Sequence, residues 1–275
     1  MINELSKSDV NQIKENARAK IGVCRKDNDI IGTQIFPILS LYARVIYYPL
    51  GKDAPWGFTR ISGAQNDTPL EKPFVAINSS IPVDCQVFAA AHELYHIWYE
   101  QKPDVLPSDL LNSKNQAINE KKANRFAAEF LVDEQLLKQE IDIYKIQKYT
   151  IKSILQLAAL FSVPYRTMVK RLFEISVISG SEADKFLSET EAAIEQYKKR
   201  YSIPIVNADE RIAIDNLVEL TVNAYEKGLI SFEKLEYLLE MSKMTPEDLG
   251  IEKKSSYSFP SDDELDVSWR NEYGR

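Results

Sequence analysis

The chain has 275 residues, of which 44% are hydrophobic and 27% are charged, a composition that argues against wholesale disorder. Its net charge of -7 argues against a broad nucleic-acid interface, because phosphate binding needs clustered Lys and Arg. Its two cysteines, Cys24 and Cys85, cannot build a disulfide framework, and no apolar run has the length of a leader or of a membrane span. We therefore expect a cytoplasmic protein with no membrane partner.

The N-terminal third of the chain predicts two helices and a small sheet. Helical spacing of apolar residues covers 8–20 and 29–42, and Pro37 should begin or kink the second helix. Short runs rich in β-branched and aromatic residues alternate with turn-rich segments. These runs predict strands over 44–48, 57–62 and 74–78.

From residue 82 onward the apolar patterns are helical. The segment 83–101 contains no Gly or Pro and places Val87, Ala90, Leu94 and Trp98 on one stripe, which predicts a helix with that stripe against the core. Further helices are expected over 115–132, 134–143 and 150–160, after Pro164, from the capping-box-like Ser181–Asp184 to about residue 201, and in two or three segments through residue 244.

The two histidines of the chain stand four residues apart, in His92-Glu93-Leu94-Tyr95-His96. Four residues on a helix turn about 40° around its axis, so both imidazoles project from one face and can share a metal ion. Glu93 lies about 100° from His92 and can act on a water molecule at the metal without being a ligand. The motif therefore predicts hydrolysis assisted by one Zn²⁺ ion, with Glu93 as general base, although Mn²⁺ or Fe²⁺ would accept similar donors.

A third protein ligand has to be Glu or Asp, with Cys as a remote option, because no histidine remains. Glu120 and Glu129 are nine residues apart, about 180° around a helix, so only one of them can face the metal. We expect Glu120 to be the ligand and interpret Glu129 as a solvated carboxylate. Asn124, one turn after Glu120, is placed to hydrogen-bond the outer nitrogen of a histidine.

The run FAAAHELYHIWY, followed by ExxANRFAAEFL, resembles the ImmA/IrrE family of metallo-endopeptidases over roughly residues 31–175. This family is similar to thermolysin-like zinc peptidases in using two histidines and a glutamate. The resemblance implies Glu120 as third ligand, with Asn124 at the family's Asn position. It also implies that strand 74–78 lies beside the cleft as an edge for an extended peptide. Tyr95 stands where many members have Gly, and Val132-Asp133 replaces their Met-Pro.

The resemblance implies cleavage of a helix-turn-helix repressor or antitoxin, which relieves repression, as in members from bacteria, phages and mobile elements. A non-enzymatic regulator braced by zinc and a toxin-type protease of broader specificity are alternatives. A third alternative is a repressor that contacts DNA through the two helices of residues 150–175, with Arg166, Lys170 and Arg171. The competing interpretation of those helices is packing against the core, and the acidic net charge supports it.

The fold class predicted is α+β, with a small twisted sheet packed on the metal-binding helix, then a mainly helical lobe and a helical C-terminal region. We expect a metallopeptidase domain over residues 1–180 and a helical region over 181–252. Residues 253–275, rich in Ser, Asp and Glu, are expected to be disordered.

Overall fold

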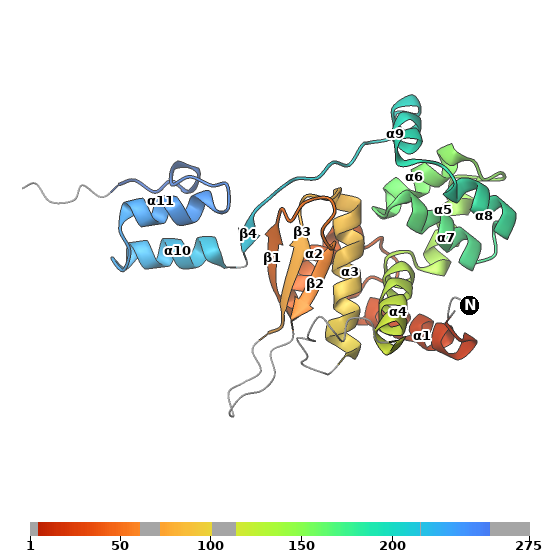
Figure 1. The fold of residues 1–275 in the computed structure, drawn as a ribbon, viewed down its shortest axis with the longest axis horizontal. Helices are drawn as coiled ribbons and strands as arrows, with labels where there is room; N and C mark the ends of the chain where they lie inside the picture. The colour runs from red at the N-terminus through yellow and green to blue at the C-terminus, as the bar shows by residue number, and fades with distance from the viewer. Residues whose placement is uncertain (1–4, 61–71, 101–113, 215, 254–275) are drawn as a thin grey trace, which may run out of the picture. The chain divides into compact units, whose positions relative to one another are not determined.

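The computed structural model of the protein describes residues 5–60, 72–100, 114–214 and 216–253 (Figure 1). The chain forms two compact units, Met1–Asp215 and Asn216–Arg275. The α+β prediction is confirmed, because the first unit combines a small mixed sheet with helices and the described part of the second is helical. None of the described helices combines the length and the apolar character that a membrane crossing needs.

The elements of the first unit follow the predicted order closely. Its strands are β1 (Arg44–Tyr48), β2 (Gly57–Arg60), β3 (Phe74–Asn78) and β4 (Ala213–Ile214). Its helices are α1 (Lys7–Val23), η1 (Gly32–Gln34), α2 (Ile35–Tyr42), α3 (Val83–Tyr99), α4 (Lys114–Leu131), α5 (Glu134–Ile143), α6 (Ile151–Phe161), α7 (Tyr165–Glu174), α8 (Gly180–Leu187) and α9 (Glu191–Arg200).

The four strands form one sheet in the order β2-β3-β1-β4. β3 runs parallel to β1 and antiparallel to β2, so the expectation that strand 74–78 is an edge is wrong. The reason is that β2 pairs along β3 from Gly57 opposite Ile77 to Arg60 opposite Phe74, which satisfies the backbone groups on that side. In the described sheet β2 is the edge strand next to α3, while the short β4 pairs with the outer side of β1.

Helix α3 packs against the sheet through an apolar stripe. Val87, Ala90 and Leu94 are fully buried, as the stripe in the sequence predicts, and they join a core that includes Val75 and Ile77 of β3. On its other side α3 packs against α4, which in turn packs against α1 (Figure 1). The sheet and α4 therefore hold α3 between them, which fixes its orientation.

The segment after α7 differs from its predicted form. The capping box is made by Ser179, whose hydroxyl accepts from the N–H of Glu182, and not by Ser181 and Asp184. The helix that follows does not continue to residue 201, because it ends at Leu187 and Thr190 caps the separate helix α9. α8 packs on α7, and both helices belong to the first unit. The boundary expected near residue 180, between a metallopeptidase domain and a helical region, stays a prediction.

The second unit contains α10 (Leu217–Glu226), α11 (Phe232–Glu240) and the short η3 (Glu247–Leu249). Tyr225, Leu235 and Leu239 form its buried core. These helices agree with those predicted through residue 244. The disorder expected from residue 253 onward concerns a segment that lies outside the described residues, except for Lys253.

Candidate metal centre

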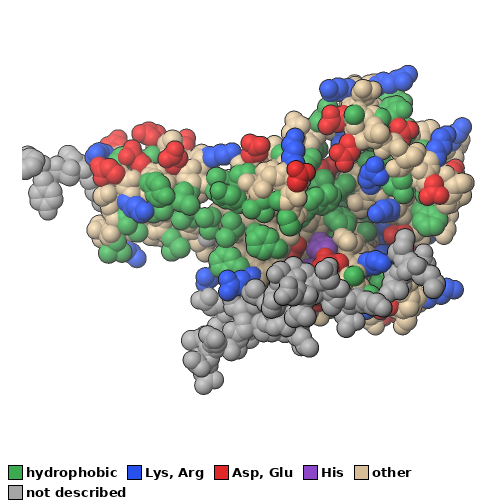
Figure 2. Space-filling model, viewed as in Figure 1, with side chains coloured by type: hydrophobic (Ala, Val, Ile, Leu, Met, Phe, Trp, Pro, Cys, Tyr) green, Lys and Arg blue, Asp and Glu red, His purple; other side chains and the backbone are tan. Residues whose placement is uncertain are grey.

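Three side chains from two helices converge on one point. His92 and His96 lie one turn apart on α3, and their Nε2 atoms are 3.0 Å from each other. Glu120, in the first half of α4, places Oε2 3.1 Å from His92 Nε2 and Oε1 3.7 Å from His96 Nε2. Figure 2 shows a histidine side chain (purple) at the surface, beside acidic side chains (red), so the cluster is open to solvent on that face.

The spacing and chemistry of these donors fit a divalent metal ion. Donors about 2 Å from a tetrahedral zinc ion lie about 3.3 Å apart, and the observed separations of 3.0–3.7 Å bracket that value. Two imidazoles and one carboxylate leave the fourth position of a tetrahedral ion free, as catalytic sites require. Among the described residues this is the one cluster of three or more His, Cys, Asp or Glu side chains with metal-ligand spacing.

The outer nitrogens of both histidines also have partners. His92 Nδ1 lies 3.0 Å from Asn124 Oδ1, the contact expected for Asn124, and His96 Nδ1 lies 2.8 Å from Glu100 Oε2. Both partner atoms are acceptors, an arrangement that favours a proton on Nδ1 of each imidazole and leaves the Nε2 lone pairs for a cation. Sequence reasoning missed Glu100, although its position four residues after His96, at the end of the predicted helix, was a usable signal.

Glu93 is buried behind the cluster, with 4% of its surface exposed. Thr59 of the edge strand donates a hydrogen bond from Oγ1 to Glu93 Oε2, at 2.7 Å. Gly57 leaves room for the carboxylate, because a Cβ there would lie 3.1 Å from Glu93 Oε1. Neither contact was predicted, since both depend on how β2 is placed against α3, far away in sequence. β2 therefore shapes the surroundings of the expected base.

The electrostatics of the cluster suit a cation and a base. Burial raises the pKa of Glu93, while His92 and the Thr59 hydrogen bond oppose that shift. The hydrogen bond to His92 lowers the pKa of Glu120, which favours the ionised form that a metal ligand needs. Burial opposes protonation of His96, but the nearby carboxylates of Glu100, Glu93 and Glu120 raise its pKa overall. A positive charge is thus favoured at this point.

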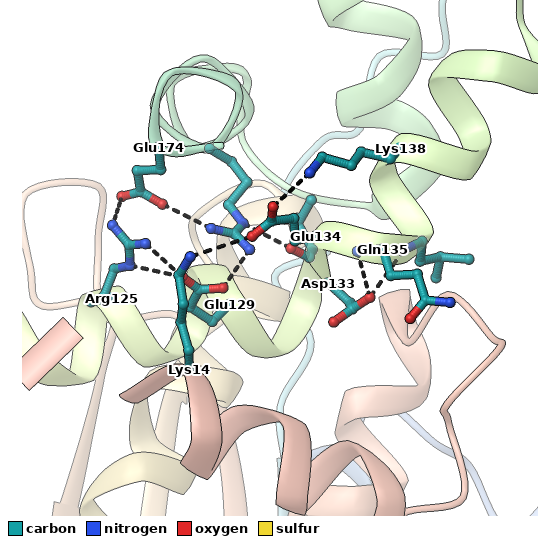
Figure 3. A network of polar contacts seen from close by, with 11 residues as sticks. Lys14, Arg125, Glu129, Asp133, Glu134, Gln135, Lys138 and Glu174 are labelled. Atoms are coloured by element: carbon teal, nitrogen blue, oxygen red, sulfur yellow. Dashed lines mark hydrogen bonds and ion pairs between the residues drawn. The ribbon is translucent and has the colours of Figure 1, made fainter. Parts of the chain in front are cut away.

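Glu129 lies on the opposite face of α4 and is not solvated. Only 5% of its surface is exposed, and it accepts hydrogen bonds from Arg125, at 3.0 Å, and from the fully buried Arg171 (Figure 3). Both arginines also pair with Glu174 of α7, and Arg171 donates to the carbonyl of Val132 at 2.8 Å. The interpretation of Glu129 as a solvated carboxylate was wrong. The turn of about 180° that separates it from Glu120 directs it into the contact with α7.

The buried side chains of helices α6 and α7 pack into the core of the first unit. Met168 and Leu172 are fully buried, as is Arg171, which cannot reach a DNA backbone from that position. Arg166 is exposed and donates to the carbonyls of Leu187 and Glu189. Of the three basic residues considered for DNA contact, one is therefore buried and one caps a neighbouring segment, which supports the packing interpretation.

Comparison with protein families supports the same region of the chain. Residues 43–173 match the family model Peptidase_M78, described as the IrrE N-terminal-like domain. No curated protein matches the chain. The matched residues run from the start of β1 to the end of α7 and contain the two histidines, Glu93, Glu120 and Asn124. This match supports an ImmA/IrrE-type metallopeptidase domain over the matched residues.

Proposed function

We propose that this protein is a zinc-dependent endopeptidase that cleaves a regulatory protein, a helix-turn-helix repressor or an antitoxin, and so relieves repression. The convergence of the two Nε2 atoms and the Glu120 carboxylate, beside the buried Glu93, is the observation that carries the proposal. The family match supports a peptidase. Zinc is our choice among divalent ions because the set of two imidazoles and one carboxylate, with a position left open, is that of zinc peptidases.

The residues around the cluster can carry out amide hydrolysis in a simple order. A bound zinc ion would polarise the carbonyl of the scissile bond and acidify a water molecule. Glu93 accepts the proton of that water and passes it to the leaving amine. Thr59 holds Glu93 Oε2, which leaves Oε1 to receive the proton. The raised pKa of the buried Glu93 makes it a stronger base than an exposed glutamate.

The free edge of β2 supports binding of an extended chain segment. β2 is unpaired on its outer side in the described sheet, and it lies against α3 through the contact of Thr59 with Glu93. A substrate strand that paired with this edge would pass beside the cluster with its main chain fixed by hydrogen bonds. Pairing along a strand edge would bind an internal segment of a chain through its main chain, which suits an endopeptidase. In this proposal β2 takes the role that the family resemblance implied for strand 74–78.

The chain's own charge supports a DNA-binding regulator as substrate. The net charge of -7 favours association with basic proteins, and helix-turn-helix proteins carry basic groups for phosphate contact. The family resemblance implies the same class. Such a regulator acts on DNA in the cytoplasm, where we therefore place the cleavage.

The direct test mixes the purified protein with the helix-turn-helix protein encoded beside its gene. With zinc present, the proposal predicts defined fragments by mass spectrometry, and a chelator should prevent them. Glu93→Gln should bind zinc but not cleave, whereas Glu195→Gln, the same change at an exposed position on α9, should cleave normally. A wild-type protein that leaves the regulator intact would contradict the substrate proposal. Normal cleavage by Glu93→Gln would contradict the role of the base and favour a zinc-braced regulator if function is also retained.

A further inference from the structure

We propose that Glu100 is a positioning residue of the metal centre, whose carboxylate holds His96 with Nε2 toward the ion and strengthens it as a ligand. This inference rests on the proposed metal site and adds a residue to it. Glu100 contacts His96 and not the reacting atoms, so its effect would pass through the imidazole.

The position of Glu100 follows from how α3 ends. The helix stops at Tyr99, and Glu100 is its C-cap residue, with an extended backbone (φ -106°, ψ 101°). Its N–H still donates to the carbonyl of His96, at 3.0 Å, while its side chain returns so that Oε2 lies 2.8 Å from His96 Nδ1. The same residue therefore contacts both the backbone and the ring of His96. This double contact restricts the rotation of the imidazole.

The surroundings of Glu100 Oε1 also support a role in positioning His96. Oε1 is buried and has no hydrogen-bond partner among the described residues. Leaving a buried carboxylate oxygen without a partner costs free energy, so packing alone gives no reason for a carboxylate here. A carboxylate does have a physical role here if it orients His96 and raises the basicity of the Nε2 lone pair that would bind a cation.

The two histidine ligands would then differ in strength. Asn124 offers His92 a neutral amide oxygen at 3.0 Å, whereas Glu100 offers His96 a carboxylate at 2.8 Å. A carboxylate partner makes the imidazole a stronger donor than an amide partner does, because it stabilises positive charge on the ring. His96 would therefore be the stronger of the two histidine ligands.

The test measures zinc affinity by competition with a chromophoric chelator, for the wild-type protein, Glu100→Ala, Glu100→Gln and the control Glu195→Gln. Loss of an outer partner weakens metal binding by about 10- to 100-fold. Glu100→Ala, which removes the hydrogen bond and the charge, should approach the upper end of that range. Glu100→Gln, which keeps an acceptor, should lie near the lower end. The visible bands of the Co²⁺-substituted protein should shift in both variants, and circular dichroism of the metal-free proteins should not change.

The outcomes separate this inference from the proposed function. Affinities of both Glu100 variants within about threefold of wild type, with unchanged Co²⁺ bands, would overturn it while leaving the metal site intact. A loss in Glu100→Ala alone would overturn the role given to the charge. If Glu100→Ala fails to fold, the isosteric Glu100→Gln decides the question by the same two readouts. A wild-type protein that binds no zinc would instead contradict the metal site itself.

Discussion

The buried ion-pair network between α4 and α7 gives the sharpest prediction about stability. Arg171 is fully buried and donates to Glu129, to Glu174 and to the carbonyl of Val132 (Figure 3). Arg171→Met fills a similar volume but removes all three hydrogen bonds. Glu129 would then keep Arg125 as its charged partner, with most of its surface still out of water.

The expected cost follows from this burial. Breaking a buried pair by removing one partner typically costs about 3–5 kcal/mol. Here Glu129 and Glu174 would share Arg125, so one buried negative charge would lose its compensating arginine. For a unit of this size each kcal/mol lowers the melting temperature by about 2–4 °C, so the variant should melt about 6–20 °C lower. Since α4 carries Glu120 and Asn124, the loosened packing would also reach the helix that supplies these two residues of the candidate metal centre.

The assay is urea unfolding of the metal-free protein, followed by tryptophan fluorescence from Trp56 and Trp98 of the first unit. Arg166→Met is the matched control, because it removes an exposed arginine from the same helix and should cost about 1 kcal/mol or less. A loss for Arg171→Met no larger than that of the control would refute the reasoning. It would mean that the carboxylates protonate or find water at little cost.

Further predictions concern the base, the edge strand and the metal. Thr59→Val removes the hydrogen bond to Glu93 and should lower kcat by about 10- to 100-fold, because hydrogen bonds to charged groups contribute about 1.5–3 kcal/mol. Thr59→Ser keeps the hydroxyl and should cleave nearly normally. Neither variant should lose zinc affinity. Gly57→Ala should slow cleavage, since its Cβ would lie 3.1 Å from Glu93 Oε1, and normal turnover would show that the carboxylate can shift without loss. Hydrogen bonds from Lys138 and Lys14 lower the pKa of Glu134, so these pairs add stability above the usual carboxyl pKa of 4.5 and lose it as pH falls through the folded value. Urea titrations should therefore find Glu134→Gln less stable than wild type at neutral pH, by about 0.5 kcal/mol, and equal to it in acid. Adding zinc at about 1,000 times its Kd should raise the free energy of unfolding by about 4 kcal/mol over the chelated protein, as measured by calorimetry.

Local patterns in the sequence predicted most of the helices and strands of the fold. The three main strands and most helices of the first unit were predicted within a few residues, because their apolar periodicity and turn residues are local signals. The sheet order was not, since β2 takes the outer side of β3 through pairing between segments distant in sequence. The two-residue strand β4 also escaped, because so short a pairing has no periodicity to detect.

The candidate site divides in the same way. The spacing of His92 and His96 and the expected positions of Glu120 and Asn124 depend on helix geometry, and the structure brings these four side chains together. The surroundings of Glu93 depend instead on the tertiary contact of β2 with α3, which no local pattern encodes. Glu129 shows the limit most clearly. Its direction away from the two histidines follows from helical rotation, but its burial depends on arginines supplied partly by α7.

The central claim is that one divalent ion lies between His92, His96 and Glu120, and anomalous diffraction at the zinc absorption edge tests it most directly. In crystals grown with zinc, the account predicts one strong anomalous peak about 2 Å from the Nε2 atoms of both histidines and from a Glu120 oxygen. A map with no peak among these side chains, or with zinc bound only elsewhere on the molecule, would contradict it.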